Sequence, residues 1–163
     1  MTVFDVEMYA WLFPYADQAL LNSLETNNLD LGDLHGYESA IANVRLFGTV
    51  GFTWLDMECP DALAGMLSDF LLSLAEIDVV VLYARRPNGI KFSLRSERSE
   101  VHAGNLAREA LMDWGSGGGH AAMAGGFVPA EKLPEDPRMR YEAVIAQFTG
   151  VIRRMYPQIL KEM

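Results

Sequence analysis

A glycine run that ends in a histidine is the first feature of this sequence that could do chemistry. Residues 115–126 read GSGGGHAAMAGG. Glycine has no Cβ, so a phosphate or a nucleobase can approach its backbone closely. The imidazole of His120 can donate a hydrogen bond to a phosphate oxygen or to a base edge. The sequence therefore predicts a backbone cradle at Gly117, Gly118 and Gly119, with His120 at its edge.

Residues 120–124, which read HAAMA, contain strong helix formers and predict a short helix directly after the glycines. The first turn of such a helix would add free N–H groups and the positive end of a dipole. The alternative interpretation is a flexible linker, the usual role of a Gly/Ser run. Small residues continue to Gly126, and this favours a closely packed segment over a flexible linker. Two known nucleotide loops are excluded: a P-loop needs Lys and then Ser or Thr after its glycines, and the dinucleotide-binding motif needs a strand before them.

Arg95 is the second candidate for binding an anion. It lies in the sequence SLRSERS, at the end of a predicted strand. Its guanidinium can hold a phosphate through two parallel hydrogen bonds, and the hydroxyl of Ser93 or Ser96 can add another. The alternative is a solvated charge on an edge strand. We therefore take Arg95, Ser93 and Ser96 as candidate substrate-binding residues, together with the glycines and His120.

The distribution of charge supports an anion site in this part of the chain. The net charge is −9, which by itself argues against an anionic partner. Residues 1–78, however, hold thirteen acidic residues and one basic residue. Residues 85–108 hold six basic and two acidic residues, a local charge of +4. This basic segment ends just before the glycine run, so attraction for anions is concentrated there.

The remaining signals indicate a soluble protein. No apolar run approaches the roughly 18–20 residues that cross a bilayer, and Asp5 and Glu7 stand where a signal peptide would be basic. We expect a cytoplasmic protein with no membrane partner. His35 is interpreted as a surface residue, His102 as a residue at a helix start, and the single Cys59 as a small buried hydrophobe.

Alternating helical and strand patterns predict an α/β (α+β) fold with a mixed sheet flanked by helices. The predicted helices are 4–25, interrupted at Pro14, and 34–46, 62–76, 103–113 and 138–156; the predicted strands are 47–55, 79–83, 90–95 and 126–128. Residues 87–89, Pro-Asn-Gly, strongly favour a turn and predict that strands 79–83 and 90–95 form a β-hairpin. The apolar alternate residues of 90–95 would then face one side of the sheet and the polar ones the other.

A strand–turn–strand unit ending in SLRS, a helix containing NLA, and then GSGGGH and AGG resemble a known pattern. Residues 79–128 are similar to the C-terminal, DHH-associated domain of the DHH-family phosphoesterases. That family includes oligoribonuclease-type nanoRNA and phosphoadenosine phosphate phosphatases, RecJ-type single-strand exonucleases and cyclic-dinucleotide phosphodiesterases. The resemblance implies two parts. Residues 1–46 would be a helical lead-in segment that follows a missing catalytic domain, and residues 47–163 would be a DHH-associated substrate-binding domain.

In that family the N-terminal domain carries the catalytic metals, two manganese ions held by Asp and His clusters. This chain has no Asp-His-His triplet and only three histidines. The resemblance therefore implies no catalytic residue, metal ligand or cofactor in this chain, with manganese in the absent domain. The implied partners are that N-terminal DHH domain and a short single-stranded oligonucleotide or nucleotide phosphate, gripped by the glycines, His120 and Arg95. A homodimer is left open.

Two other classes of function stay open at this point. The chain could be a complete small phosphate-ester hydrolase in which His120 is the nucleophile or general acid, although no carboxylate is adjacent to it. It could also be an interaction domain whose acidic residues 1–78 dock a protein partner and whose glycines are structural. The identity of the ligand, whether nanoRNA, cyclic dinucleotide, single-stranded DNA or polyphosphate, is not determined by the sequence.

Overall fold

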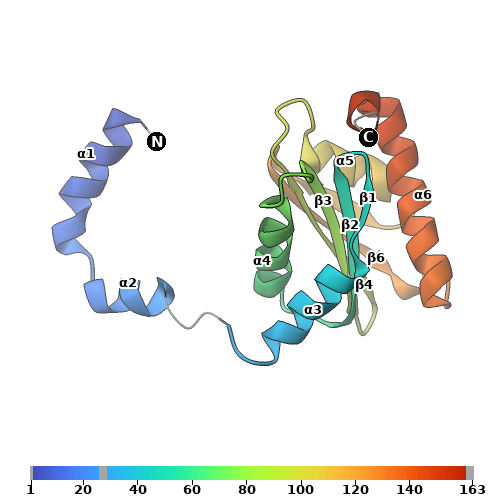
Figure 1. The fold of residues 1–163 in the computed structure, drawn as a ribbon, viewed down its shortest axis with the longest axis horizontal. Helices are drawn as coiled ribbons and strands as arrows, with labels where there is room; N and C mark the ends of the chain where they lie inside the picture. Colours follow the sequence, from blue (N-terminus) through green and yellow to red (C-terminus); the bar gives the residue numbers. More distant parts are fainter. Residues whose placement is uncertain (1, 26–28, 161–163) are drawn as a thin grey trace. The chain divides into compact units, whose positions relative to one another are not determined.

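The computed structural model describes residues 2–25 and 29–160. Their contacts divide the chain into two compact units, Met1–Leu34 and His35–Met163. The larger unit consists of one β-sheet with helices on both faces (Figure 1). The predicted α/β class with a mixed sheet is therefore confirmed.

The described residues contain one sheet of six strands. The strands are β1 (Arg45–Phe47), β2 (Val50–Glu58), β3 (Val79–Arg86), β4 (Gly89–Ser96), β5 (Ser116–Gly119) and β6 (Met123–Pro129). Their order is β1-β2-β3-β4-β6-β5. The β2–β3 pair is parallel, since a crossover helix joins these strands, and every other neighbouring pair is antiparallel. The glycine run thus becomes an edge strand, β5.

Helices cover the two faces of the sheet (Figure 1). They are α3 (Asp33–Asn43), α4 (Asp61–Leu72), α5 (Ala103–Leu111) and α6 (Pro137–Met155), with 3-10 turns η2 (Ala130–Lys132) and η3 (Pro157–Leu160). Helices α3 and α4 lie on one face, and α5 and α6 lie on the other. The predicted helices over 34–46, 62–76, 103–113 and 138–156 are confirmed, with ends that differ by at most four residues.

Strand β3 reads as an apolar run because helices cover both of its sides. Its odd-numbered residues pack with α5 and α6, and its even-numbered residues pack with α4. Strand β4 differs: Ile90, Phe92 and Leu94 join the α5–α6 core, as the alternation predicts. The polar residues of β4 face the α4 side of the sheet, and this side holds the candidate site.

One predicted strand and one predicted turn show how glycine shapes the sheet. The predicted turn at 87–89 joins β3 to β4, which confirms the hairpin. The predicted strand 47–55 is a second hairpin, because β1 turns into β2 at Gly48. Gly48 has a φ of 60°, and an added Cβ would lie 2.1 Å from the carbonyl oxygen of Ile159. Only glycine fits that turn.

The N-terminal unit contains α1 (Val3–Leu12), the 3-10 turn η1 (Phe13–Tyr15) and α2 (Gln18–Glu25). The predicted helix over 4–25 is confirmed with its interruption at Pro14. Thr2 and Asp5 form a capping box at the start of α1. No side chain of α1 is buried. The predicted boundary between residues 46 and 47 concerns a parent protein and stays a prediction.

Candidate ligand-binding site

The glycine run forms a β-hairpin with the residues that follow it. Strand β5 pairs with β6 through Gly117–Gly126 and Gly118–Gly125, so the predicted helix over 120–124 is wrong. The turn between the strands is held by α5, whose first N–H groups bond to it: Ala103 N–H donates to Ala121 O at 2.8 Å, and Gly104 N–H to His120 O at 3.0 Å. The exposed dipole that the sequence placed after the glycines is therefore absent.

One side of the glycine hairpin packs directly on α5. A Cβ on Gly117 would lie 2.6 Å from the carbonyl oxygen of Ala107. A Cβ on Gly126 would lie 2.2 Å from Leu111 Cδ1 and 2.8 Å from the carbonyl oxygen of Ser116. These two glycines are required by packing, since any side chain would push the hairpin off the helix.

The other side of the hairpin is open. An added Cβ on Gly118 would meet nothing within 4 Å, and one on Gly125 would meet only the carbonyl oxygen of Phe92, at 3.3 Å. Gly118 pairs with Gly125, and Gly125 pairs with Ser93, so the three form one row across β5, β6 and β4. We call the surface formed by Ser116, Gly118, Gly125 and Phe127 the glycine face. A shallow hollow of about 350 Å³ lies over it.

Arg95 stands at the end of β4 on the same side of the sheet as the glycine face. Its Nε donates to Asp69 Oδ1 at 2.6 Å, and its Nη1 to Leu94 O at 3.1 Å and to Ser93 Oγ at 3.4 Å. Its side chain is 16% exposed, whereas that of Asp69 is 62% exposed. The guanidinium is therefore held in a fixed position, and its partner carboxylate lies toward solvent.

Ser93 belongs to a buried chain of hydrogen bonds that supports Arg95. Its Oγ lies 2.9 Å from Ser68 Oγ, which lies 2.8 Å from the carbonyl oxygen of Ala64. When Ser68 gives its single proton to Ala64, Ser93 must donate to Ser68 and accept from Arg95. Both serines are buried. The structure thus brings Ser93 and Arg95 together, with Ser93 positioning the guanidinium.

Two of the predicted site residues are placed differently from this pair. Ser96 points to the opposite side of the sheet, is 5% exposed, and donates from Oγ to the carbonyl oxygen of Arg98 at 3.3 Å. The structure does not bring its hydroxyl to Arg95. His120 lies in the exposed β5–β6 turn, where its backbone N–H donates to the carbonyl oxygen of Met123 at 2.8 Å. Gly119, just before it, has a φ of 153°.

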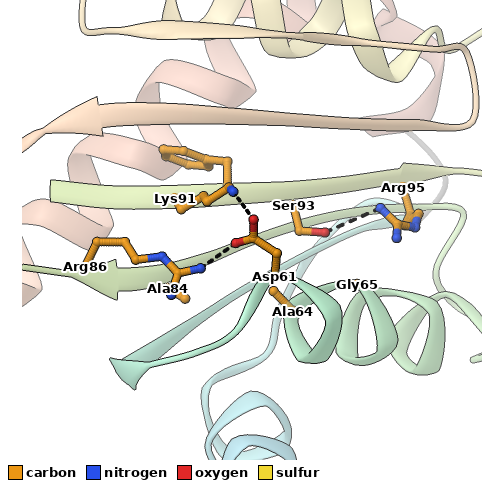
Figure 2. Close-up of a pocket in the computed structure, with 9 residues that line it drawn as sticks. Asp61, Ala64, Gly65, Ala84, Arg86, Lys91, Ser93 and Arg95 are labelled. Atoms are coloured by element: carbon orange, nitrogen blue, oxygen red, sulfur yellow. Dashed lines mark hydrogen bonds and ion pairs between the residues drawn. The ribbon is translucent and has the colours of Figure 1, made fainter.

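A second hollow lies beside Arg95, between α4 and the hairpin of β3 and β4 (Figure 2). Its volume is about 140 Å³. Asp61 projects from α4 between Arg86 and Lys91 and forms an ion pair with each. The hydrogen bond from Lys91 is the main reason that the pKa of Asp61 is lowered, against the opposing effect of burial. We call this hollow the α4 cavity.

The sequence did not single out Lys91, Arg86 or Asp61. Lys91 lines both the α4 cavity and the hollow over the glycine face, so the two are neighbours. The signal that could have found Lys91 is its place on β4, two and four residues before the chosen Ser93 and Arg95. Asp61 is thirty residues away in sequence, and only the α4 crossover brings it there.

Other predicted roles can be compared with the structure. Cys59 is buried, as predicted. His102 caps α5, since its Nδ1 accepts from Asn105 N–H at 3.2 Å. His35 is 76% exposed and lies 3.6 Å from Glu38. Within the described residues, no helix is long and apolar enough to cross a membrane. The same residues contain no group of three or more His, Cys, Asp or Glu that could hold a metal ion.

Comparison with known families decides the relationship. The family model described as the DHHA1 domain matches residues 50–136, which is more than half of the chain. The chain belongs to the DHHA1 domain family. The matched range contains β2 to β6, and therefore Arg95, the α4 cavity and the glycine face. The predicted resemblance to DHH-associated domains is confirmed.

Solved structures share the DHHA1 fold. The chain is similar to an exopolyphosphatase-related protein from Bacteroides fragilis, with a TM-score of 0.71 and 14% identity over 96% of this chain and 46% of that one. It is similar to the C-Ala domain of alanyl-tRNA synthetase from Aquifex aeolicus, with a TM-score of 0.51 and 24% identity over 66% and 96%. RecJ from Thermus thermophilus gives a TM-score of 0.54 and 20% identity over 75% and 17%.

The DHHA1 chain spans less than half of the first of these proteins and about a sixth of RecJ. At these identities the likeness is one of fold. No curated protein sequence matches the chain.

Proposed function

We propose that this DHHA1 chain is the nucleotide-binding part of a cytoplasmic DHH-family phosphoesterase. It grips a phosphate and a base of a short oligonucleotide, and a separate N-terminal DHH domain with manganese cleaves the bond. The observation that carries this proposal is the row from Gly118 through Gly125 to Ser93, open on the side where Arg95 stands. A backbone surface without side chains beside a fixed guanidinium suits a flat base with its phosphate.

The glycine face supports close approach of a base. Gly118 leaves open space where other residues carry a side chain, and Phe127 lies next to Ser116 and Gly118 at the hollow. A nucleobase can stack on an aromatic ring, which is worth about 1–3 kcal/mol per base in other proteins. We therefore assign the base to this face, with His120 at the turn beside it as a donor to the ligand.

Arg95 supplies the charge for the phosphate. Because Leu94 O and Ser93 Oγ orient its guanidinium, little rotational freedom remains to be lost on binding. Asp69 is the more exposed partner, so a phosphate can replace its carboxylate while the arginine stays in place. The fixed geometry makes Arg95 suited to hold a phosphate through two hydrogen bonds.

The catalytic chemistry is assigned to another domain. The described residues do not fit a two-manganese centre, because they contain no cluster of three or more ligating side chains. RecJ from Thermus thermophilus has been solved in complex with Mn²⁺, and this chain covers only 16% of that protein.

Fluorescence anisotropy with a labelled RNA of five nucleotides tests the proposal. We expect saturable binding that is about tenfold weaker in Arg95→Gln, because one charge-assisted hydrogen-bond pair is lost. His120→Ala should weaken binding severalfold. Arg108→Gln is the matched control, since Arg108 lies on the exposed side of α5 and donates to Asn105.

Equal losses in Arg95→Gln and Arg108→Gln would indicate a general effect of charge and would contradict a phosphate site at Arg95. Absence of binding to the five-nucleotide RNA would favour the alternative of a protein-interaction domain. Hydrolysis of the RNA by this chain alone would instead favour the alternative of a complete phosphate-ester hydrolase.

A further inference from the structure

The α4 cavity holds three basic side chains and is wide enough for a ligand group. Arg86, Lys91 and Arg95 line it, together with Ser93 and Asp61. Its volume of about 140 Å³ is below the roughly 300–1,000 Å³ of pockets for drug-sized ligands, and it suits one small group such as a phosphate. Counting Asp69, which pairs with Arg95, three positive charges face two negative ones, which leaves a formal charge of +1.

We infer that the α4 cavity is a second phosphate subsite and that Asp61 occupies it when no ligand is bound. The inference rests on the proposed function for its ligand class, an oligonucleotide with at least two phosphate groups. One phosphate lies at Arg95, and a second replaces the Asp61 carboxylate between Arg86 and Lys91.

The exposures of the three side chains support this exchange. The side chain of Asp61 is 63% exposed, whereas that of Lys91 is 42% and that of Arg86 is 22% exposed. Figure 2 shows the carboxylate between the two cations, which come from β4 and β3. The anion of the pair is therefore the group that can turn into solvent, and the two cations remain together to receive a phosphate.

The walls of the cavity keep the subsite open. Gly65 stands where an added Cβ would lie 3.1 Å from Arg95 Nη2, so the absence of a side chain on α4 leaves room for the guanidinium. Ala64 and Ala84 complete the small walls around Asp61 (Figure 2). Larger side chains at these places would fill the space between α4 and β4.

The spacing of the cations defines the ligand. Lys91 and Arg95 lie on one side of β4 and are four residues apart, which is about 13 Å along an extended strand. A ligand whose phosphates are separated by a nucleoside can reach both, and Lys91 also borders the hollow over the glycine face where we place a base. We therefore expect a preference for a 5′-phosphorylated dinucleotide over the same dinucleotide without its 5′-phosphate.

The test is a titration of the full chain with inorganic pyrophosphate, followed by amide chemical shifts. We expect saturable shifts at Arg86, Lys91 and Gly65. Asp61→Asn should bind about threefold to tenfold more tightly, because the exposed carboxylate no longer competes for the two cations. Lys91→Gln should bind about tenfold more weakly. Asp113→Asn, which removes the same charge at an exposed residue after α5, is the control.

Tighter binding in Asp61→Asn but not in Asp113→Asn, with melting temperatures showing that both variants fold, would establish the competition. Equal affinity in the two aspartate variants, or shifts outside the α4 cavity, would overturn the inference, as would the absence of saturable shifts at millimolar pyrophosphate. The proposed function is tested separately by the RNA titration. Pyrophosphate binding without RNA binding would contradict the proposed function alone. RNA binding, with pyrophosphate affinity unchanged in Asp61→Asn and Lys91→Gln, would contradict the second subsite alone.

Discussion

The two sides of the glycine hairpin predict opposite outcomes for two neighbouring substitutions. In Gly117→Ala the new methyl group would lie 2.6 Å from the carbonyl oxygen of Ala107, a backbone atom of α5 that cannot turn away. Such overpacking costs about 1–3 kcal/mol of unfolding free energy. In Gly118→Ala the methyl group meets nothing within 4 Å. Alanine also restricts the unfolded chain more than glycine does, so stability should rise by about 0.5–1 kcal/mol.

For ligand binding, Gly118→Ala should have a larger effect than Gly117→Ala. The methyl group of Gly118→Ala stands on the glycine face and prevents close approach of a base, which should weaken binding of the five-nucleotide RNA about threefold to tenfold. Gly117→Ala adds nothing to that face, so below its melting temperature its affinity should change less. The pair therefore separates a glycine required for packing from one required for the ligand.

Thermal unfolding and RNA anisotropy on the same preparations test this pair. For a domain of this size 1 kcal/mol corresponds to about 2–4 °C. We expect Gly117→Ala to melt roughly 3–9 °C lower and Gly118→Ala to melt at or slightly above the wild type. A fall in melting temperature for Gly118→Ala that matches the fall for Gly117→Ala would refute the assignment of the two faces.

Three further predictions concern stability. Burial raises the pKa of Tyr141 to about 12, and its buried hydroxyl has no hydrogen-bond partner among the described residues. Tyr141→Phe should therefore stabilise the protein by about 1 kcal/mol at pH 7. The folded pKa is above the ordinary value of 10, so the unfolded chain ionises first, and the free energy of unfolding falls as the pH rises from 10 toward 12. The variant should lose less stability over that interval in urea titrations, and an unchanged alkaline profile would contradict the assignment. His102→Ala removes the cap of α5 and should cost about 1 kcal/mol, which calorimetry can check; no change would mean that the cap contributes nothing. Deletion of residues 1–32 should leave the melting temperature within about 2 °C, because every buried hydrophobic residue described lies between Ala40 and Ile159, and a large fall would show that the first unit supports the core.

The sequence predicted the elements whose side chains carry a strong period. The hairpin of β3 and β4 follows from the turn at Pro87–Asn88–Gly89 and from the alternation of Ile90 to Arg95. The buried face of β4 follows from the same alternation. These signals are local, so no knowledge of tertiary contacts was needed.

The glycine strand could not be predicted in this way. Ser116–Gly119 has almost no side chains, so it shows neither a period of two nor a period of 3.6. Its conformation is set by pairing with β6 and by the N–H groups at the start of α5, which bond to the turn at His120 and Ala121. The alanines after His120 have a helical preference that these tertiary hydrogen bonds override.

The site was predictable only in part for the same reason. Arg95 and Ser93 are neighbours on one strand and were found together. Their partners, Asp69 for Arg95 and Ser68 for Ser93, come from α4 and reach β4 only through the crossover between β2 and β3. The same crossover brings Asp61 to Arg86 and Lys91. Ser96 is next to Arg95 in the sequence, but strand alternation turns its hydroxyl to the other side of the sheet.

The most direct test of the central claim is amide chemical-shift mapping of the full chain with a 5′-phosphorylated dinucleotide. The account predicts saturable shifts concentrated at Gly118, Gly125, Ser93 and Arg95. In Arg95→Gln the same dinucleotide should shift these amides only at about tenfold higher concentration. Shifts that spare the glycine face and gather elsewhere, for example around Trp54 of β2 and Tyr141 of α6, would contradict the claim that this face binds the nucleotide.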